Sequence, residues 1–127
     1  MNEPSKTAEE LLAQFLTHYN SEYLPLKKPL PKQLYEFTTK CSEELGEVCE
    51  AASALKGKRR KIKKLQLDNK TPQFALAEEI MDLMINLLNL AHSAGLDQNY
   101  LFETGIWKLN AKVTEKKLKL KNKNETV

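Results

Sequence analysis

Several residue types that define other protein classes are scarce in this chain of 127 residues. It has two cysteines and two histidines, too few for a disulfide framework, and their spacing matches no usual zinc site. If Cys41 and Cys49 share one helix, they are about 12 Å apart along its axis, which is too far for a disulfide. We therefore expect two reduced, mostly buried thiols.

Long hydrophobic runs are also missing. No stretch of about 18 apolar residues occurs, so the sequence predicts no membrane-spanning helix and no membrane partner. The first residues, "MNEPSKTAEE", are acidic and polar, unlike the basic and then apolar start of a signal peptide. These two observations lead us to expect a cytoplasmic protein.

What the chain does have is enough apolar residues for one core and an uneven charge. Hydrophobic residues make up 41% of it, and the length is typical of a single domain. The net charge of +3 combines the basic segment "KGKRRKIKK" at 56–64 with glutamates gathered at 36–50 and 78–82. We expect one domain over residues 1–115, followed by a basic, flexible tail over 116–127.

The apolar periodicity predicts four helices and no strand, hence an all-α fold. The predicted segments are Thr7–Tyr19, which opens with the capping-box spacing "TAEE", 31–56, 72–94, and a last helix from Asp97 through Trp107 into the tail. Prolines in "YLPLKKPLPK" predict an extended connection between the first two helices. The segment "KGKRRKIKKLQLDNKTP" indicates a polar loop or a frayed helix extension.

The helix predicted at 72–94 is apolar on almost every face, so we expect it to be buried nearly all round. Its few polar residues are spaced 3, 4, 3 and 4 apart and form one narrow stripe: Glu79, Asp82, Asn86, Asn89 and Ser93. Three neighbouring helices of this size cover such a helix poorly. The sequence therefore predicts a four-helix assembly that forms a homodimer or a dimer of dimers.

Acidic residues at helical spacing form the candidate functional site. In "CSEELGEVCE", Glu44 and Glu47 share a strip beside the apolar face with Lys40, whereas Glu43 lies farther round. Glu79 and Asp82 repeat the i, i+3 spacing on a helix with almost no other polar surface. Buried carboxylates need a positive partner, and hard oxygen ligands favour Mg²⁺ or Mn²⁺.

The same acids have two other interpretations. The "EExxE" run alone is typical of a solvated helix face, but the second pair of acids has no such surroundings. A di-iron bundle normally needs Glu-x-x-His pairs, and no histidine lies three residues beyond any of these acids. Together the two pairs favour a site for one or two Mg²⁺ or Mn²⁺ ions.

The segments "KCSEELGEVCEA" and "EEIMDLMINLLNLAHSAGLD" resemble the MazG-like nucleoside triphosphate pyrophosphohydrolases of the all-α NTP pyrophosphatase superfamily. The shared signature is E-E-x-x-E, a variable spacer, and E-x-x-D, and the likeness covers about residues 33–112. The resemblance implies a four-helix bundle that assembles as a homo-oligomer. It also implies Mg²⁺-dependent hydrolysis of a (deoxy)nucleoside triphosphate to the monophosphate and pyrophosphate.

The resemblance also assigns roles to residues. The implied metal ligands are Glu44, Glu47, Glu79 and Asp82, and the implied catalytic residues are Glu43, which would be an outer ligand or position the attacking water, and Glu47. The implied phosphate-binding and substrate-binding residues are Lys40, Lys108, Asn110 and Lys112. At position 112 the family pattern has arginine, and lysine lacks the bidentate guanidinium fork of that residue.

Alternatives of other classes stay open at this stage. The chain could be a non-catalytic helical bundle that binds a nucleotide or a nucleic acid, because two of its segments are basic. It could instead be a phosphoribosyl-ATP pyrophosphohydrolase of the same superfamily. The segment 56–64 is either solvated or close to the triphosphate. Tyr35, Phe102 and Trp107 either pack in the core or stack on a base.

Overall fold

The structure, a computed structural model, describes residues 5–125. All the regular secondary structure in that range is helical. The predicted all-α class is confirmed. In chain order the elements are α1 (Ala8–His18), the π-helical turn η1 (Tyr19–Tyr23), α2 (Leu24–Lys27), the 3₁₀ turn η2 (Pro31–Gln33), α3 (Leu34–Leu55), α4 (Arg59–Leu67), α5 (Pro72–Ser93) and α6 (Gln98–Glu125). None of the helices within residues 5–125 combines the length and the hydrophobicity that a membrane crossing requires.

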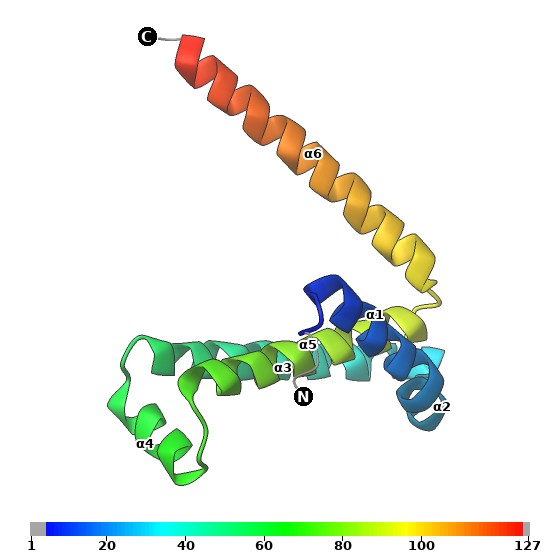
Figure 1. Cartoon of the computed structure of the whole chain (residues 1–127). Coiled ribbons are helices and arrows are strands. Elements are labelled where there is room, and N and C mark those ends of the chain that lie inside the picture. The colour runs from blue at the N-terminus through cyan, green and yellow to red at the C-terminus, as the bar shows by residue number, and fades with distance from the viewer. Residues whose placement is uncertain (1–4, 126–127) are drawn as a thin grey trace.

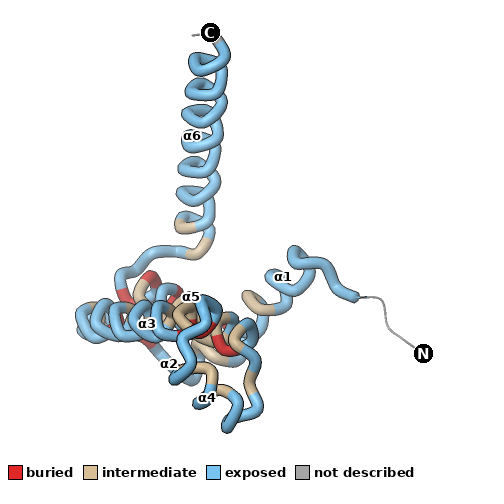
Figure 2. Tube along the Cα trace, turned by 90° about the vertical axis from the view of Figure 1, so that its left-hand side faces the viewer, coloured by how far each residue is buried: buried red, intermediate tan, exposed pale blue. Residues whose placement is uncertain are grey.

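The centre of the molecule is the pair α3 and α5, which lie side by side with α4 at one end and α2 toward the other (Figure 1). Most of the buried residues belong to these two helices (Figure 2). Most of them are small; the buried apolar residues of the pair are Phe37, Ala51, Ala54, Ala75, Leu88 and Ala91. Small side chains let two helices approach closely, so polar residues at the edges of this contact are also brought near one another.

The start of α1 confirms the predicted capping box. The Thr7 hydroxyl oxygen accepts a hydrogen bond from the Glu10 amide at 3.1 Å, and the Glu10 carboxylate accepts one from the Thr7 amide at 3.3 Å. These two bonds satisfy amide groups that have no partner within the helix.

The extended connection predicted after Tyr19 is largely wrong. The chain stays helical through η1 and α2 to Lys27. Pro25 is tolerated because it lies in the first turn of α2, where its missing amide hydrogen costs least. Lys28, with a left-handed φ of 47°, ends this helical stretch, and only residues 28–30 separate it from η2.

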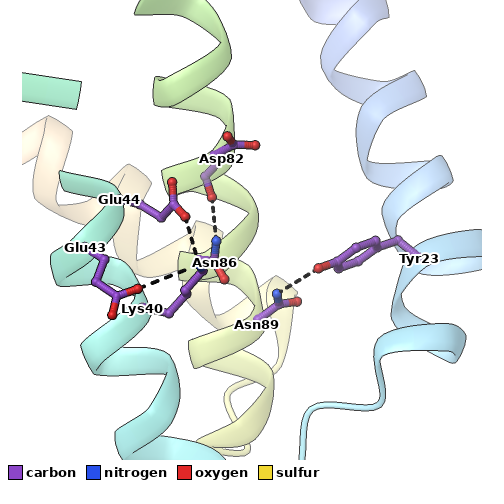
Figure 3. A network of polar contacts seen from close by, with 7 residues as sticks. All are labelled: Tyr23, Lys40, Glu43, Glu44, Asp82, Asn86 and Asn89. Carbon is purple, nitrogen blue, oxygen red and sulfur yellow. Dashed lines mark hydrogen bonds and ion pairs between the residues drawn. The ribbon is translucent and has the colours of Figure 1, made fainter. Parts of the chain in front are cut away.

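A buried polar network joins this N-terminal segment to α5. The Tyr19 hydroxyl donates to the Asn89 side-chain oxygen at 2.8 Å. The Asn89 amide group donates to the Tyr23 hydroxyl at 3.3 Å, and Figure 3 shows this second bond. Asn89 is 0% exposed, and burial raises the pKa of Tyr19 to about 12. Asn89 therefore has a structural role inside one chain.

α3 and α5 begin and end within three residues of the predicted boundaries. The Thr71 hydroxyl caps α5 by accepting from the Phe74 amide at 3.1 Å, and Gly95, with φ of +75°, follows its end. Between α3 and α5 the expected loop or frayed extension is instead a separate helix, α4. It begins after Gly57, whose φ of +87° turns the chain sharply.

The expectation that α5 is buried nearly all round is wrong for a single chain. Ile80, Met84 and Leu87 remain 41%, 39% and 47% exposed. The reason is the course of α6, which extends away from the α3–α5 pair instead of covering it (Figures 1 and 2). The expected four-helix bundle is therefore not confirmed.

α6 begins as predicted, since the Asp97 carboxylate accepts from the Asn99 amide at 2.7 Å. Its backbone is helical through Glu125, so the basic segment expected to be flexible continues α6 over residues 116–125. Cys41 and Cys49 are free thiols, as expected. Cys49, however, is exposed and not buried, because it lies on the side of α3 that faces away from α5.

The Asn89 network yields a stability prediction. Tyr19→Phe removes the donor to a fully buried oxygen, so we expect a loss of about 1–3 kcal/mol in the free energy of unfolding, measured by urea denaturation. Tyr35→Phe is the control, because Tyr35 is 81% exposed and should change stability little. Equal stability of both variants and the wild type would refute a structural role for this network.

Candidate metal centre

The three acids of the E-E-x-x-E motif on α3 differ in exposure. The side chain of Glu44 is only 13% exposed, whereas Glu43 and Glu47 are exposed. The helix period explains the difference between Glu43 and Glu44, since adjacent residues are about 100° apart around the axis. Glu47 lies one turn beyond Glu44 on a neighbouring strip of the helix.

Across from Glu44, α5 presents the second acidic pair. Glu79 is partly buried and Asp82 is exposed. One ligand atom each from Glu44, Glu79 and Asp82 can be chosen so that all three lie within 4.8 Å of one another. Three of the four predicted metal ligands thus come together from two helices that are separated by a whole helix in the sequence.

The fourth predicted ligand, Glu47, is nearby but is not a member of this group in the part of the chain that the structure describes. Its charge is close enough to contribute to the raised pKa of Glu79, and both side chains line the same pocket. Glu47 therefore lies at the edge of the site.

The carboxylates of the group repel one another. The pKa of Glu79 is raised, first by burial and then by the neighbouring charges of Asp82, Glu47 and Glu44. Two unit charges about 4 Å apart repel by about 1 kcal/mol in bulk water and by about 4 kcal/mol at an effective dielectric constant of about 20. Partial burial thus strengthens the repulsion, and a divalent cation with oxygen ligands would relieve it.

Lys40 is the basic residue that contacts this group. Its ammonium lies 3.4 Å from a Glu44 carboxylate oxygen and 3.7 Å from one of Glu43 (Figure 3). Its pKa is raised, mainly by the hydrogen bond and charge of Glu44. Glu43 thus pairs with Lys40 on the outside of the site. The Lys40 side chain is 51% exposed, so its ammonium stays accessible to a ligand.

The predicted substrate-binding residues of the last helix are placed elsewhere. Lys108, Asn110 and Lys112 are exposed on α6, which extends away from α3 and α5 (Figure 1). The Asn110 backbone oxygen accepts from the Thr114 hydroxyl at 2.9 Å within that helix. A single chain therefore does not bring these three residues to the carboxylates.

Two further features lie beside the site. The Asn86 amide group donates to the Asp82 backbone oxygen at 3.0 Å, next to the carboxylates (Figure 3). In addition, Lys61, Lys64 and Lys70 line a pocket together with Glu47 and Glu79. The local sequence carries no spacing signal for this pocket, because it depends on how α4 folds back.

Comparisons of the chain with known protein families, with curated proteins and with solved structures give no match. Its chemistry must therefore be argued from its own residues.

The crowded carboxylates yield a prediction about metal and stability. Mg²⁺ or Mn²⁺ should raise the melting temperature of the wild-type protein by a few degrees, because an ion that binds only the folded chain stabilises it. Glu79→Gln removes one like charge, so its metal-free form should melt higher than the wild type and respond less to the ion.

Differential scanning fluorimetry over a range of ion concentrations measures both effects. Glu103→Gln on the exposed surface of α6 is the matched control and should respond to metal as the wild type does. The same metal response in Glu79→Gln as in the control would show that the ion binds elsewhere.

Proposed function

We propose that the protein is a divalent-metal-dependent nucleoside triphosphate pyrophosphohydrolase of the MazG-like kind. The observation that carries the proposal is the group of Glu44, Glu79 and Asp82, which two helices bring within 4.8 Å of one another. These residues belong to the two acidic motifs on which the resemblance rests. The reaction would add water across the link between the α- and β-phosphates and give a nucleoside monophosphate and pyrophosphate.

The carboxylates would have two tasks in this reaction. Glu44, Glu79 and Asp82, with Glu47 at the edge, would hold Mg²⁺, or Mn²⁺ in its place. A bound ion of this kind neutralises phosphate charge and lowers the pKa of a coordinated water. Glu43, on the outer side of the site, would position the attacking water or act as an outer ligand.

Lys40 fits the phosphate-binding role that the resemblance implies. Its exposed ammonium lies beside Glu44, so it could reach a phosphate oxygen next to the bound ion and stabilise the charge that develops on the leaving pyrophosphate. The proposed substrate-binding residues on α6 are Lys108, Asn110 and Lys112. They could reach the substrate only if α6 of another copy of the chain approached the carboxylates.

A homo-oligomer would meet that requirement and would also cover exposed apolar surface. Besides Ile80, Met84 and Leu87 on α5, α6 exposes a stripe at steps of 4, 3 and 4, namely Phe102, Ile106, Leu109 and Val113. A groove lined almost entirely by apolar side chains lies where α1, α5 and the start of α6 meet. Surfaces of this kind are typical of interfaces between subunits.

The activity test uses the purified protein with a panel of NTPs, dNTPs and phosphoribosyl-ATP, with and without Mg²⁺. Phosphorus NMR separates pyrophosphate from orthophosphate among the products. We expect metal-dependent release of pyrophosphate. Asp82→Asn and Glu47→Gln should each reduce kcat by at least about a hundredfold with an unchanged fold by circular dichroism, because both remove a ligand charge.

The control for these variants is Glu36→Gln, which removes an exposed glutamate on the same helix as Glu47. It should keep full activity. Turnover of phosphoribosyl-ATP alone would assign the chain to the related pyrophosphohydrolase. Full metal-dependent activity in Asp82→Asn, or no turnover of any substrate by the folded wild type, would refute the proposal.

The assembly has a separate test. The wild type should sediment as a dimer or a tetramer in analytical ultracentrifugation, and Ile106→Glu/Leu109→Glu should shift it to monomer. Both side chains are more than 60% exposed in a single chain, at 61% and 63%, so the change should not unfold it. Lys117→Glu on the same helix is the control and should keep the oligomer. A monomeric wild type would contradict the proposed assembly.

A further inference from the structure

α4 brings a strongly basic surface to the end of the α3–α5 pair at which α3 ends and α5 begins (Figure 1). Two ion pairs hold it there. Lys61 of α4 pairs with Glu50 of α3, and Lys70, just after α4, pairs with Glu78 of α5 at 2.8 Å. The basic segment and the residues that follow it are thus paired with one carboxylate on each of the two long helices.

The space between α4 and the two long helices is a pocket of about 190 Å³. A cavity needs about 10–15 Å³ of such volume for one water molecule, so this pocket has room for much more than water alone. On the side of α3 and α5, its wall includes Glu47 and Glu79. On the side of α4, its wall includes Lys61 and Lys64. The pocket therefore adjoins the candidate metal centre through Glu79, which belongs to both.

The two lysines on the α4 wall have the spacing needed to act together. They are three residues apart, so they lie on one face of the helix, whereas the exposed Lys63 points elsewhere and does not line the pocket. Lys61 is partly neutralised by Glu50. Lys64 has no carboxylate within ion-pair distance in residues 5–125, so its charge is available to a ligand.

From this placement we propose that Lys61 and Lys64 form an anion subsite for a polyphosphate ligand. Some phosphate oxygens of the ligand would contact the two lysines, and neighbouring oxygens would contact a divalent ion at Glu44, Glu79 and Asp82. The inference rests on the proposed function and adds to it the residues of α4. The subsite works only together with the ion, because Glu47, Glu78, Glu79 and Asp68 also line the pocket and would repel a bare anion.

The same acidic residues argue against a nucleic-acid backbone as the ligand. A nucleic-acid site is typically a continuous basic groove or face. Here the lysines face carboxylates across a small pocket. Such a pocket suits a compact anion that arrives with its own cation, and a diphosphate or triphosphate chain bound to Mg²⁺ has this chemistry.

The test is the binding of imidodiphosphate, a diphosphate analogue that resists hydrolysis, measured by isothermal titration calorimetry with and without Mg²⁺. The wild type should bind it only with Mg²⁺. Lys61→Gln/Lys64→Gln should raise Kd by at least about tenfold, because it removes two charge-assisted hydrogen bonds. Lys64→Gln alone, which keeps the Lys61–Glu50 pair, should account for a large part of this loss.

The matched control is Lys56→Gln/Lys63→Gln, which removes two exposed lysines of the same basic segment that do not line the pocket. It should bind imidodiphosphate as the wild type does. Equal weakening in both double variants, no weakening in either, or the same binding without Mg²⁺ would overturn the subsite. So would loss of oligonucleotide binding in the test variant with unchanged imidodiphosphate binding.

The test of the subsite and the test of the proposed reaction can fail independently. If the wild type hydrolyses no triphosphate but binds imidodiphosphate with Mg²⁺ through Lys61 and Lys64, the subsite stands and the reaction does not. If triphosphates are hydrolysed and the test variant has the KM of the wild type, the reaction stands and the subsite is refuted.

Discussion

Repulsion among carboxylates at the α3–α5 contact is the constraint on which the candidate site depends. Small buried side chains, among them Ala51 and Ala75, let the two helices approach closely, and this approach places Glu44 against the acidic pair of α5. Burial and neighbouring charge then raise the pKa of Glu79. The packing that stabilises the helix pair thus gathers the carboxylates that we propose as ligands of a divalent cation.

The polar stripe of α5 has two parts with opposite character. Toward the end of the helix, Asn89 and Ser93 are buried and hydrogen-bonded, to the two tyrosines of η1 and to a backbone oxygen respectively. In the part of the chain that the structure describes, no buried side-chain polar atom lacks a hydrogen-bond partner. Near its start, Glu79 and Asp82 face another carboxylate instead. One end of the stripe therefore fixes the fold, and the other is suited to bind a cation.

Local sequence rules predicted the parts that depend on neighbouring residues. The capping box at Thr7, the caps at Thr71 and Asp97, and the period of the acidic motifs on α3 and α5 all follow from spacings of a few residues. The approach of Glu44 to Glu79 and Asp82 was also predictable. Both pairs lie beside apolar faces that must pack together.

The parts that depend on long-range packing were not predictable in the same way. Pro25 continues a helix because it falls in a first turn. α4 lies back against α3, where Lys61 pairs with Glu50, eleven residues away. The apolar composition of α5 predicted burial on all sides, but the direction of α6 leaves part of it exposed. Periodicity identifies which face is apolar, and it does not say whether the same chain or another copy covers it.

We propose that Glu44, Glu79 and Asp82 hold a divalent cation. A crystal structure of the protein grown with Mn²⁺, with data collected to reveal the anomalous scattering of manganese, would locate the ion. We expect an anomalous peak between these three side chains, with Glu47 at its edge. A peak at other residues, or no peak at a saturating Mn²⁺ concentration, would show that these carboxylates do not form the metal site.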